Sequence, residues 1–181
     1  MSVLLQESAA INISHIMSFD EIYNKYYHEL RRFGSQLNVS FEKCEDLIQE
    51  TFLRFYMELK KDVIFENPRA WLYKVFLNLF RTYINSARRE QLDAELPVEA
   101  SGDLHEDYIK IEKQQIVLEM LDQLTNREKE ILLLYHKGFS YTEMAEIMGI
   151  NPNSVGKTIV RAIESLKEKL KTHYHELFEQ I

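Results

Sequence analysis

The sequence has few of the residues on which tight turns, disulfides and metal sites depend. It contains 5 glycines, 3 prolines and 1 cysteine among 181 residues. So little glycine and proline argues against collagen, against a turn-rich β-sandwich and against long low-complexity linkers. The single cysteine, Cys44, excludes a disulfide framework and a cysteine-based zinc site, and it fits a reducing compartment. We predict that Cys44 is a small apolar residue on a helix.

Long hydrophobic runs are also missing. No stretch approaches the roughly 18 apolar residues of a membrane span. Residues 1–17 include apolar side chains, but no lysine or arginine precedes them, so they do not fit a secretory signal. We expect residues 1–17 to be an N-terminal extension, and we expect a cytoplasmic protein without direct membrane insertion.

The negative charge lies mainly in one short stretch. The formal net charge is -7, which by itself argues against a nucleic-acid partner. Residues 91–109, however, hold six acidic and no basic residues, whereas 1–90 are balanced and 110–181 carry one excess acid. The stretch also contains Pro97 and Gly102. It predicts an acidic linker between modules at 18–90 and 110–181, so the net charge does not exclude nucleic acid.

Helix-start signals recur along the chain and no long period-two alternation is present. Three segments fit the capping box, in which a serine or threonine is followed three residues later by glutamate: they begin at Ser18, Thr125 and Ser140. Asn67 and Asn151 each precede a proline, which fits an N-cap followed by the first helical residue. The pattern predicts an all-α fold of two small helical domains. The expected helices are 18–38, 41–60, 67–90, 106–124, 125–137, 140–148 and 151–178.

The C-terminal module has the plan of a helix-turn-helix. A short helix at 140–148 is followed by Gly149, where a left-handed C-cap is needed, and then by a longer helix from 151. Apolar residues on that helix are spaced to face the module core, beginning at Val155 and Ile159. The opposite face carries Asn153, Ser154, Lys157, Thr158 and Arg161. Amides, hydroxyls and cations read base edges in the major groove, so this face predicts duplex DNA binding, with an ordinary solvated face as the alternative.

Two helices of the N-terminal module carry distinctive faces. Between 45 and 55, apolar residues form one face and polar residues the other, which suits either solvent or a partner protein. The helix at 67–90 mixes aromatic and basic residues, a combination that suits single-stranded nucleic acid. For Trp71 and Phe76 the residue types favour a place in the core. For Asn78, Arg81, Arg88 and Arg89 they favour nucleic acid.

Taken together, three motifs resemble bacterial RNA polymerase sigma factors of the extracytoplasmic-function (ECF) group. Asp46-Leu-Ile-Gln-Glu-Thr-Phe-Leu-Arg is similar to the family's polymerase-binding helix in region 2. Pro68-Arg-Ala-Trp-Leu-Tyr-Lys-Val-Phe-Leu-Asn78 resembles the helix that recognises and melts the −10 element. The segment from Leu124 to Ala162 resembles region 4, which reads the −35 element.

The resemblance implies a role for each group of residues. Asp46, Gln49, Glu50 and Phe52 match the surface that contacts the polymerase clamp. Asn78, Arg81, Arg88 and Arg89 match the −10 side, and the face from Asn153 to Arg161 matches the −35 side. The implied partners are core RNA polymerase through its clamp region and flap, promoter DNA in duplex and single-stranded form, and an anti-sigma factor. Neither a cofactor nor a metal is implied.

Two other functions compete with this interpretation. A stand-alone helix-turn-helix repressor or activator needs tight DNA binding without polymerase, and the weak basic balance of 110–181 argues against it. An α-helical enzyme is the other. The six histidines are scattered, and the sequence has no HExxH, Walker or nucleophile pattern, so we expect no enzymatic activity.

Overall fold

The computed structural model describes residues 18–37, 39–93 and 119–179, and these are helical without any strand. The helices are α2 (Phe19–Ser35), α3 (Phe41–Leu59), α4 (Pro68–Asp93), α6 (Asn126–His136), α7 (Tyr141–Met148) and α8 (Pro152–Glu179). The all-α prediction is confirmed. The predicted extension at 1–17, most of the predicted linker and the first part of the helix expected at 106–124 lie outside the described residues.

The predicted capping boxes form at the starts of α2, α6 and α7. In each, the side chain of Ser18, Thr125 or Ser140 accepts a bond from the glutamate backbone three residues on, and that carboxylate accepts from the cap N–H. The Ser140 N–H donates to Glu143 over 2.7 Å, for example. These bonds satisfy backbone donors that the first helical turn leaves unpaired.

The two Asn-Pro sequences also cap helices, as predicted. Asn67 Oδ1 accepts a bond from the Ala70 N–H over 3.0 Å at the start of α4. Asn151 Oδ1 accepts from the Asn153 N–H over 2.9 Å at the start of α8. Asn153, the first residue of the face predicted to contact DNA, is therefore held by the cap of its own helix.

Helices α2, α3 and α4 pack around an aromatic core. The apolar face predicted on α3 is buried, with Ile48 and Phe55 fully covered. Phe33 of α2 lies edge-on to Tyr73 of α4, with ring centroids 4.8 Å apart. Gly34 of α2 allows α2 to pack closely against α3 and α4. A Cβ at this position would collide with Cys44 Sγ of α3 and lie 3.0 Å from Phe76 Cζ of α4. Cys44 is buried on α3, as predicted.

Helices α6, α7 and α8 form the predicted helix-turn-helix. Gly149 ends α7 with φ 65° and ψ 41°, the left-handed conformation that glycine adopts without strain. Val155, Ile159 and Ala162 are buried against α6 and α7, which turns the opposite face of α8 outward.

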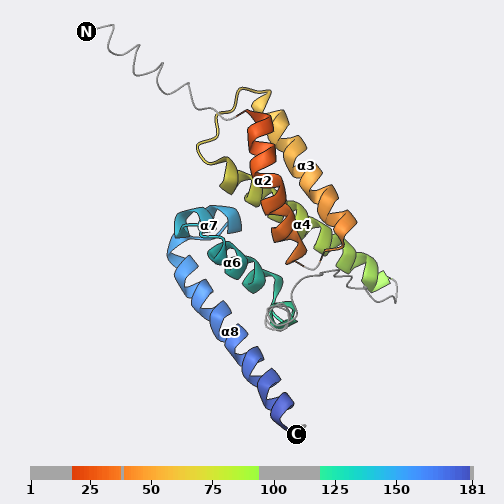
Figure 1. Cartoon of the computed structure of the whole chain (residues 1–181), viewed down its shortest axis with the longest axis vertical. Coiled ribbons are helices and arrows are strands. Elements are labelled where there is room, and N and C mark those ends of the chain that lie inside the picture. Colours follow the sequence, from red (N-terminus) through yellow and green to blue (C-terminus); the bar gives the residue numbers. More distant parts are fainter. Residues whose placement is uncertain (1–17, 38, 94–118, 180–181) are drawn as a thin grey trace, which may run out of the picture.

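The two helix groups meet where α4 lies against α7. Figure 1 shows α2, α3 and α4 grouped together, with α7 beside them and α8 running away toward the C-terminus. Tyr73 of α4 meets Phe139 of the α6–α7 turn edge-on, with centroids 4.8 Å apart. Among the described helices, none is both long enough and apolar enough to cross a membrane.

Two glycines in helices give opposite predictions for alanine substitution. Gly34→Ala should destabilise the fold by about 1–3 kcal/mol, because the added methyl overpacks the contact with Cys44 and Phe76. Gly156→Ala should stabilise it by roughly 0.5–1 kcal/mol, because a Cβ there makes an ordinary 3.5 Å contact with Tyr141 and alanine favours the helix. Urea unfolding of the two variants measures both, and equal effects of the same sign would contradict this packing.

Glu128 should make stability depend on pH. Hydrogen bonds from Ser165 and then Thr125 hold its pKa below the ordinary value of 4.5. A carboxylate with a lowered pKa in the folded state stabilises the fold above about pH 4.5, and this contribution is lost as the pH falls through the folded pKa. Glu128→Gln should therefore lower the free energy of unfolding at pH 7, with a difference that shrinks in acid. A difference that stays constant from pH 7 to pH 3 in urea titrations would argue against it.

Candidate nucleic-acid and polymerase interfaces

The outward face of α8 carries the residues predicted to contact duplex DNA. Asn153, Ser154, Lys157 and Arg161 are exposed. Thr158 is half-buried, and its hydroxyl donates to the Ser154 carbonyl over 2.8 Å. The face therefore offers amide, hydroxyl and cationic groups on one rigid helix, the combination that suits the edges of base pairs.

Sequence reasoning missed one residue of this face. Val160 is 54% exposed beside Arg161, although valine would ordinarily be counted with the core. An apolar side chain on such a face can contact a thymine methyl group. Val160 follows Ile159 directly and so lies off the buried line formed by Val155, Ile159 and Ala162. That spacing is the sequence signal that places Val160 on the outward face.

The α3 surface holds three of its four predicted polymerase contacts. Asp46 and Gln49 are exposed and Glu50 is half-buried. Phe52 is 2% exposed and packs in the core, where it contacts Phe19 and Tyr23. The assignment of Phe52 to a partner surface is therefore corrected: its side chain supports α3 from within.

Two exposed apolar residues were overlooked on α3. Leu53 is 55% exposed and Met57 is 54% exposed, one helical turn apart. They line a shallow groove together with Trp71 and Val75 of α4. An exposed apolar pair beside exposed polar side chains is typical of a protein contact surface. The i, i+4 spacing of these two residues is the sequence signal that indicates such a pair.

The predicted −10 residues of α4 fall into two groups. Asn78, Arg88 and Arg89 are exposed, whereas the Arg81 side chain is 31% exposed and engaged. Phe76 is buried in the core, as expected from its residue type, and Trp71 is half-buried against Phe55.

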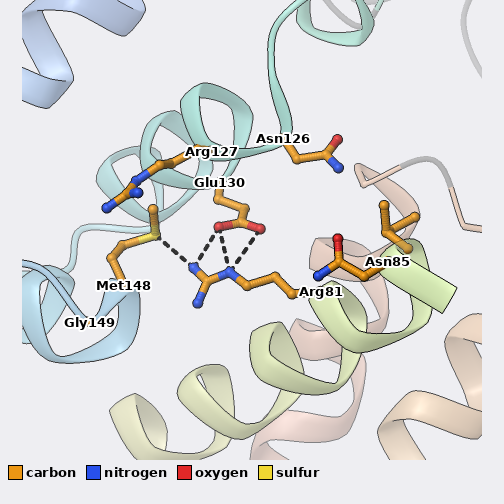
Figure 2. A pocket seen from close by; sticks show the side chains of 8 residues that line it. Arg81, Asn85, Asn126, Arg127, Glu130, Met148 and Gly149 are labelled. Atoms are coloured by element: carbon orange, nitrogen blue, oxygen red, sulfur yellow. Dashed lines mark hydrogen bonds and ion pairs between the residues drawn. The ribbon is translucent and has the colours of Figure 1, made fainter. Parts of the chain in front are cut away.

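Arg81 binds Glu130 of α6 across the junction between the helix groups. Its Nη2 donates to Glu130 Oε2 over 2.6 Å and its Nε over 3.1 Å, and Met148 Sδ lies 3.3 Å from Nη2 (Figure 2). The Glu130 side chain is 2% exposed. Burial raises the pKa of this carboxyl, while the hydrogen bonds and charge of Arg81 act in the opposite direction. Sequence reasoning missed this pair, whose members are 49 residues apart.

Neither a metal-binding cluster nor an activated cysteine is present among the described residues. No group of three or more histidine, cysteine or acidic side chains there could hold a metal ion. The Cys44 thiol is buried, and burial raises its pKa to about 11, which is the reverse of what a nucleophile needs.

Two family models match the chain, one over each helix group. The model described as Sigma-70 region 2 matches residues 22–90. The model described as Sigma-70, region 4 matches residues 114–166. Together they span more than half of the chain, in the order that the sequence motifs predicted.

Curated relatives agree with these matches. The ECF RNA polymerase sigma factor SigM of Bacillus subtilis is 27% identical over 157 residues, which cover 83% of this chain and 94% of that protein. The ECF RNA polymerase sigma factor EcfG of Rhodopseudomonas palustris is 29% identical over 147 residues, which cover 78% of each chain.

A solved structure shares the fold. The sigma factor RpoE from Bartonella quintana, in complex with the anti-sigma factor NepR, is 26% identical with a TM-score of 0.73, and the match covers 84% of this chain and 96% of that chain. The chain therefore belongs to the sigma-70 family of RNA polymerase sigma factors, in the extracytoplasmic-function group, and its function is promoter-specific transcription initiation.

Proposed function

We propose that this chain acts as a specificity subunit without covalent chemistry of its own. Residues 18–90 would bind core RNA polymerase and read the −10 element, and residues 110–181 would read the −35 element, with 91–109 as the acidic linker. The observation that carries the proposal is the outward face of α8. Four of its five polar residues are exposed, while Val155 and Ile159 are buried on the opposite side of the helix.

The proposed polymerase surface is the exposed side of α3. Asp46, Gln49 and Glu50 supply its polar part, and Leu53 with Met57 supply its apolar part. Protein interfaces combine an apolar centre with a polar rim, and this surface has both within four helical turns. Phe52 is left out of the proposed contacts because it is buried.

The proposed −10 surface is the outward side of α4. Asn78 would contact bases, and Arg81, Arg88 and Arg89 would contact the promoter strands. Exposed cations on one side of a helix suit single-stranded DNA, because phosphates bind arginine and bases stack on guanidinium planes. The deformability of the promoter would add to the selection.

An anti-sigma factor is the third proposed partner, beside core polymerase and promoter DNA. The solved relative from Bartonella quintana is bound to the anti-sigma factor NepR, and the structural match covers 84% of this chain. We propose that a protein of that class binds this chain as well.

Run-off transcription tests the proposal. Core polymerase with this chain should yield transcripts from a subset of a genomic promoter library, and the enriched templates should share −35 and −10 elements. A stand-alone regulator would instead bind its sites tightly without polymerase. The absence of any promoter-directed transcript would contradict the proposal.

Loss of the exposed apolar pair should weaken polymerase binding. Met57→Ser should raise the dissociation constant for core polymerase about tenfold, because an apolar interface anchor contributes roughly 1–2 kcal/mol. Ile64→Ser is the matched control, since Ile64 is 75% exposed but lies in the loop between α3 and α4. Fluorescence anisotropy with core polymerase measures both. Equal losses in the two variants would contradict the assignment of this surface.

Loss of a cation on α8 should weaken promoter-specific transcription without weakening the binding of core polymerase. Arg161→Ala should lower promoter-specific transcription about tenfold or more, since such a DNA contact contributes about 1–3 kcal/mol. Core polymerase binding should be unchanged. Lys167→Ala, an exposed cation farther along the same helix, is the control. If Arg161→Ala reduced core binding as strongly as transcription, this division of roles would be wrong.

A further inference from the structure

A polar cavity lies where α4 meets α6 and the end of α7. Its volume is about 390 Å³, within the range of roughly 300–1,000 Å³ that is usual for small-molecule sites. The polar side chains that line it are Arg81 and Asn85 of α4, and Asn126, Arg127 and Glu130 of α6. The proposed promoter and polymerase surfaces use neither of these asparagines nor Arg127, so promoter reading leaves the cavity unexplained.

The cavity carries one excess positive charge. Its charged side chains are the two arginines and Glu130. Arg81 donates to Glu130 from Nε and Nη2, so these two charges neutralise each other. Arg127 is exposed and forms no ion pair within the described part of the chain. Its guanidinium is therefore available to an anion that enters the cavity.

Two side-chain amides also border the cavity. Asn85 and Asn126 are exposed, and neither amide makes a hydrogen bond to another described residue. An asparagine amide offers a carbonyl acceptor and two N–H donors. In that combination it bonds to the N6 amino group and the N7 acceptor of adenine at once, which is the usual asparagine–base pairing.

Apolar groups adjoin these amides. Ile84 precedes Asn85 on α4, and Met148 of α7 lines the cavity with its Sδ 3.3 Å from Arg81 Nη2. Gly149 adds no side chain, and a Cβ there would meet nothing within 4 Å, so the space beside Met148 is open. A flat ring held by the amides can pack against isoleucine, and a thioether accepts an aromatic neighbour as well.

The polar groups are divided between two ends of the cavity. Figure 2 shows the amides of Asn85 and Asn126 on one side of the Arg81–Glu130 pair and the guanidinium of Arg127 on the other. A ligand that matches both ends has a ring with a donor–acceptor edge at one end and a negative charge at the other. A nucleotide has this construction.

We propose that the cavity binds an adenine nucleotide, with the base at Asn85 and Asn126 and the phosphate at Arg127. The site goes beyond the proposed function, since the reading of promoter DNA requires none of these three contacts. The walls of the site come from both helix groups, so the bound nucleotide contacts α4 and α6 together and stabilises the folded chain by mass action.

Calorimetric titration of the full chain with AMP tests the proposal. Binding should saturate at one AMP per chain, with a dissociation constant of about 1 mM or tighter. Ribose 5-phosphate lacks the base and adenosine lacks the phosphate, so each should bind at least tenfold more weakly. GMP should bind about tenfold more weakly, because its O6 replaces the amino group that the asparagine carbonyl accepts from.

Equal affinity for AMP and any one of these three compounds would overturn the proposal, as would the absence of saturable binding at millimolar AMP. The titration uses neither polymerase nor promoter. Its failure would therefore leave the proposed function, which run-off transcription tests, as it stands.

Two variants with matched controls assign the binding to the cavity. Arg127→Gln should weaken AMP binding about tenfold, the usual effect of losing a charge-assisted hydrogen bond. Arg32→Gln removes an exposed cation from α2 and should leave the affinity unchanged. Asn85→Ala should weaken AMP binding more than Asn24→Ala, which removes an exposed amide from α2. Equal losses within either pair would overturn the site.

A second measurement does not depend on any variant. In two-dimensional ¹⁵N–¹H spectra of the unmodified chain, AMP should shift the backbone amide signals of Asn126, Arg127 and Gly149, which border the cavity. The signal of Asn24 on α2 should stay in place. Shifts that avoid the cavity while AMP binds elsewhere would overturn the assignment.

Discussion

A buried carboxylate at the junction of the two helix groups constrains the whole arrangement. The Glu130 side chain is 2% exposed, and a charge so far from water is tolerated only beside a charge of opposite sign. Arg81 supplies that charge from α4, with two nitrogen donors on the carboxylate. The pair joins α4, the helix predicted to read the −10 element, to α6, which packs against α8, the helix predicted to read the −35 element.

The distribution of charge along the chain bears on how strongly it binds DNA. The net charge of -7 is concentrated in residues 91–109, and the two helix groups are nearly neutral. Near-neutral modules bind phosphates weakly by themselves, because affinity for DNA grows with the number of phosphates neutralised. The acidic partners of Lys74 and Arg81 lower it further. We therefore expect the free chain to bind DNA weakly and to use promoters only together with the polymerase.

Local features of the fold could be predicted from the sequence and long-range pairings could not. The capping boxes at Thr125 and Ser140 and the left-handed Gly149 follow from residues within a few positions of each other, so their signals are local. Phe52 illustrates a conflict between two signals. Its spacing predicts the buried face of α3, whereas the family resemblance predicts a partner surface. In the structure Phe52 is buried in the core.

The pairing of Arg81 with Glu130 had no local signal. Both residues sit on regular helices, and nothing in their neighbours specifies a partner 49 positions away. The same holds for Lys74 and Glu146. Periodicity tells which face of a helix is buried but not which helix covers it, so contacts between α4 and the α6–α7 group emerge only in three dimensions.

The distance between the two helix groups is the most direct measure of this account. Spin labels at Glu42→Cys on α3 and Lys167→Cys on α8, both exposed positions, report it by double electron–electron resonance. The account predicts one short distance in the free chain. It predicts longer distances in the complex with core polymerase and promoter, because the −10 and −35 elements lie about 25 base pairs apart, which is about 85 Å of duplex at 3.4 Å per pair. The same distance distribution in the free chain and in the complex would contradict it.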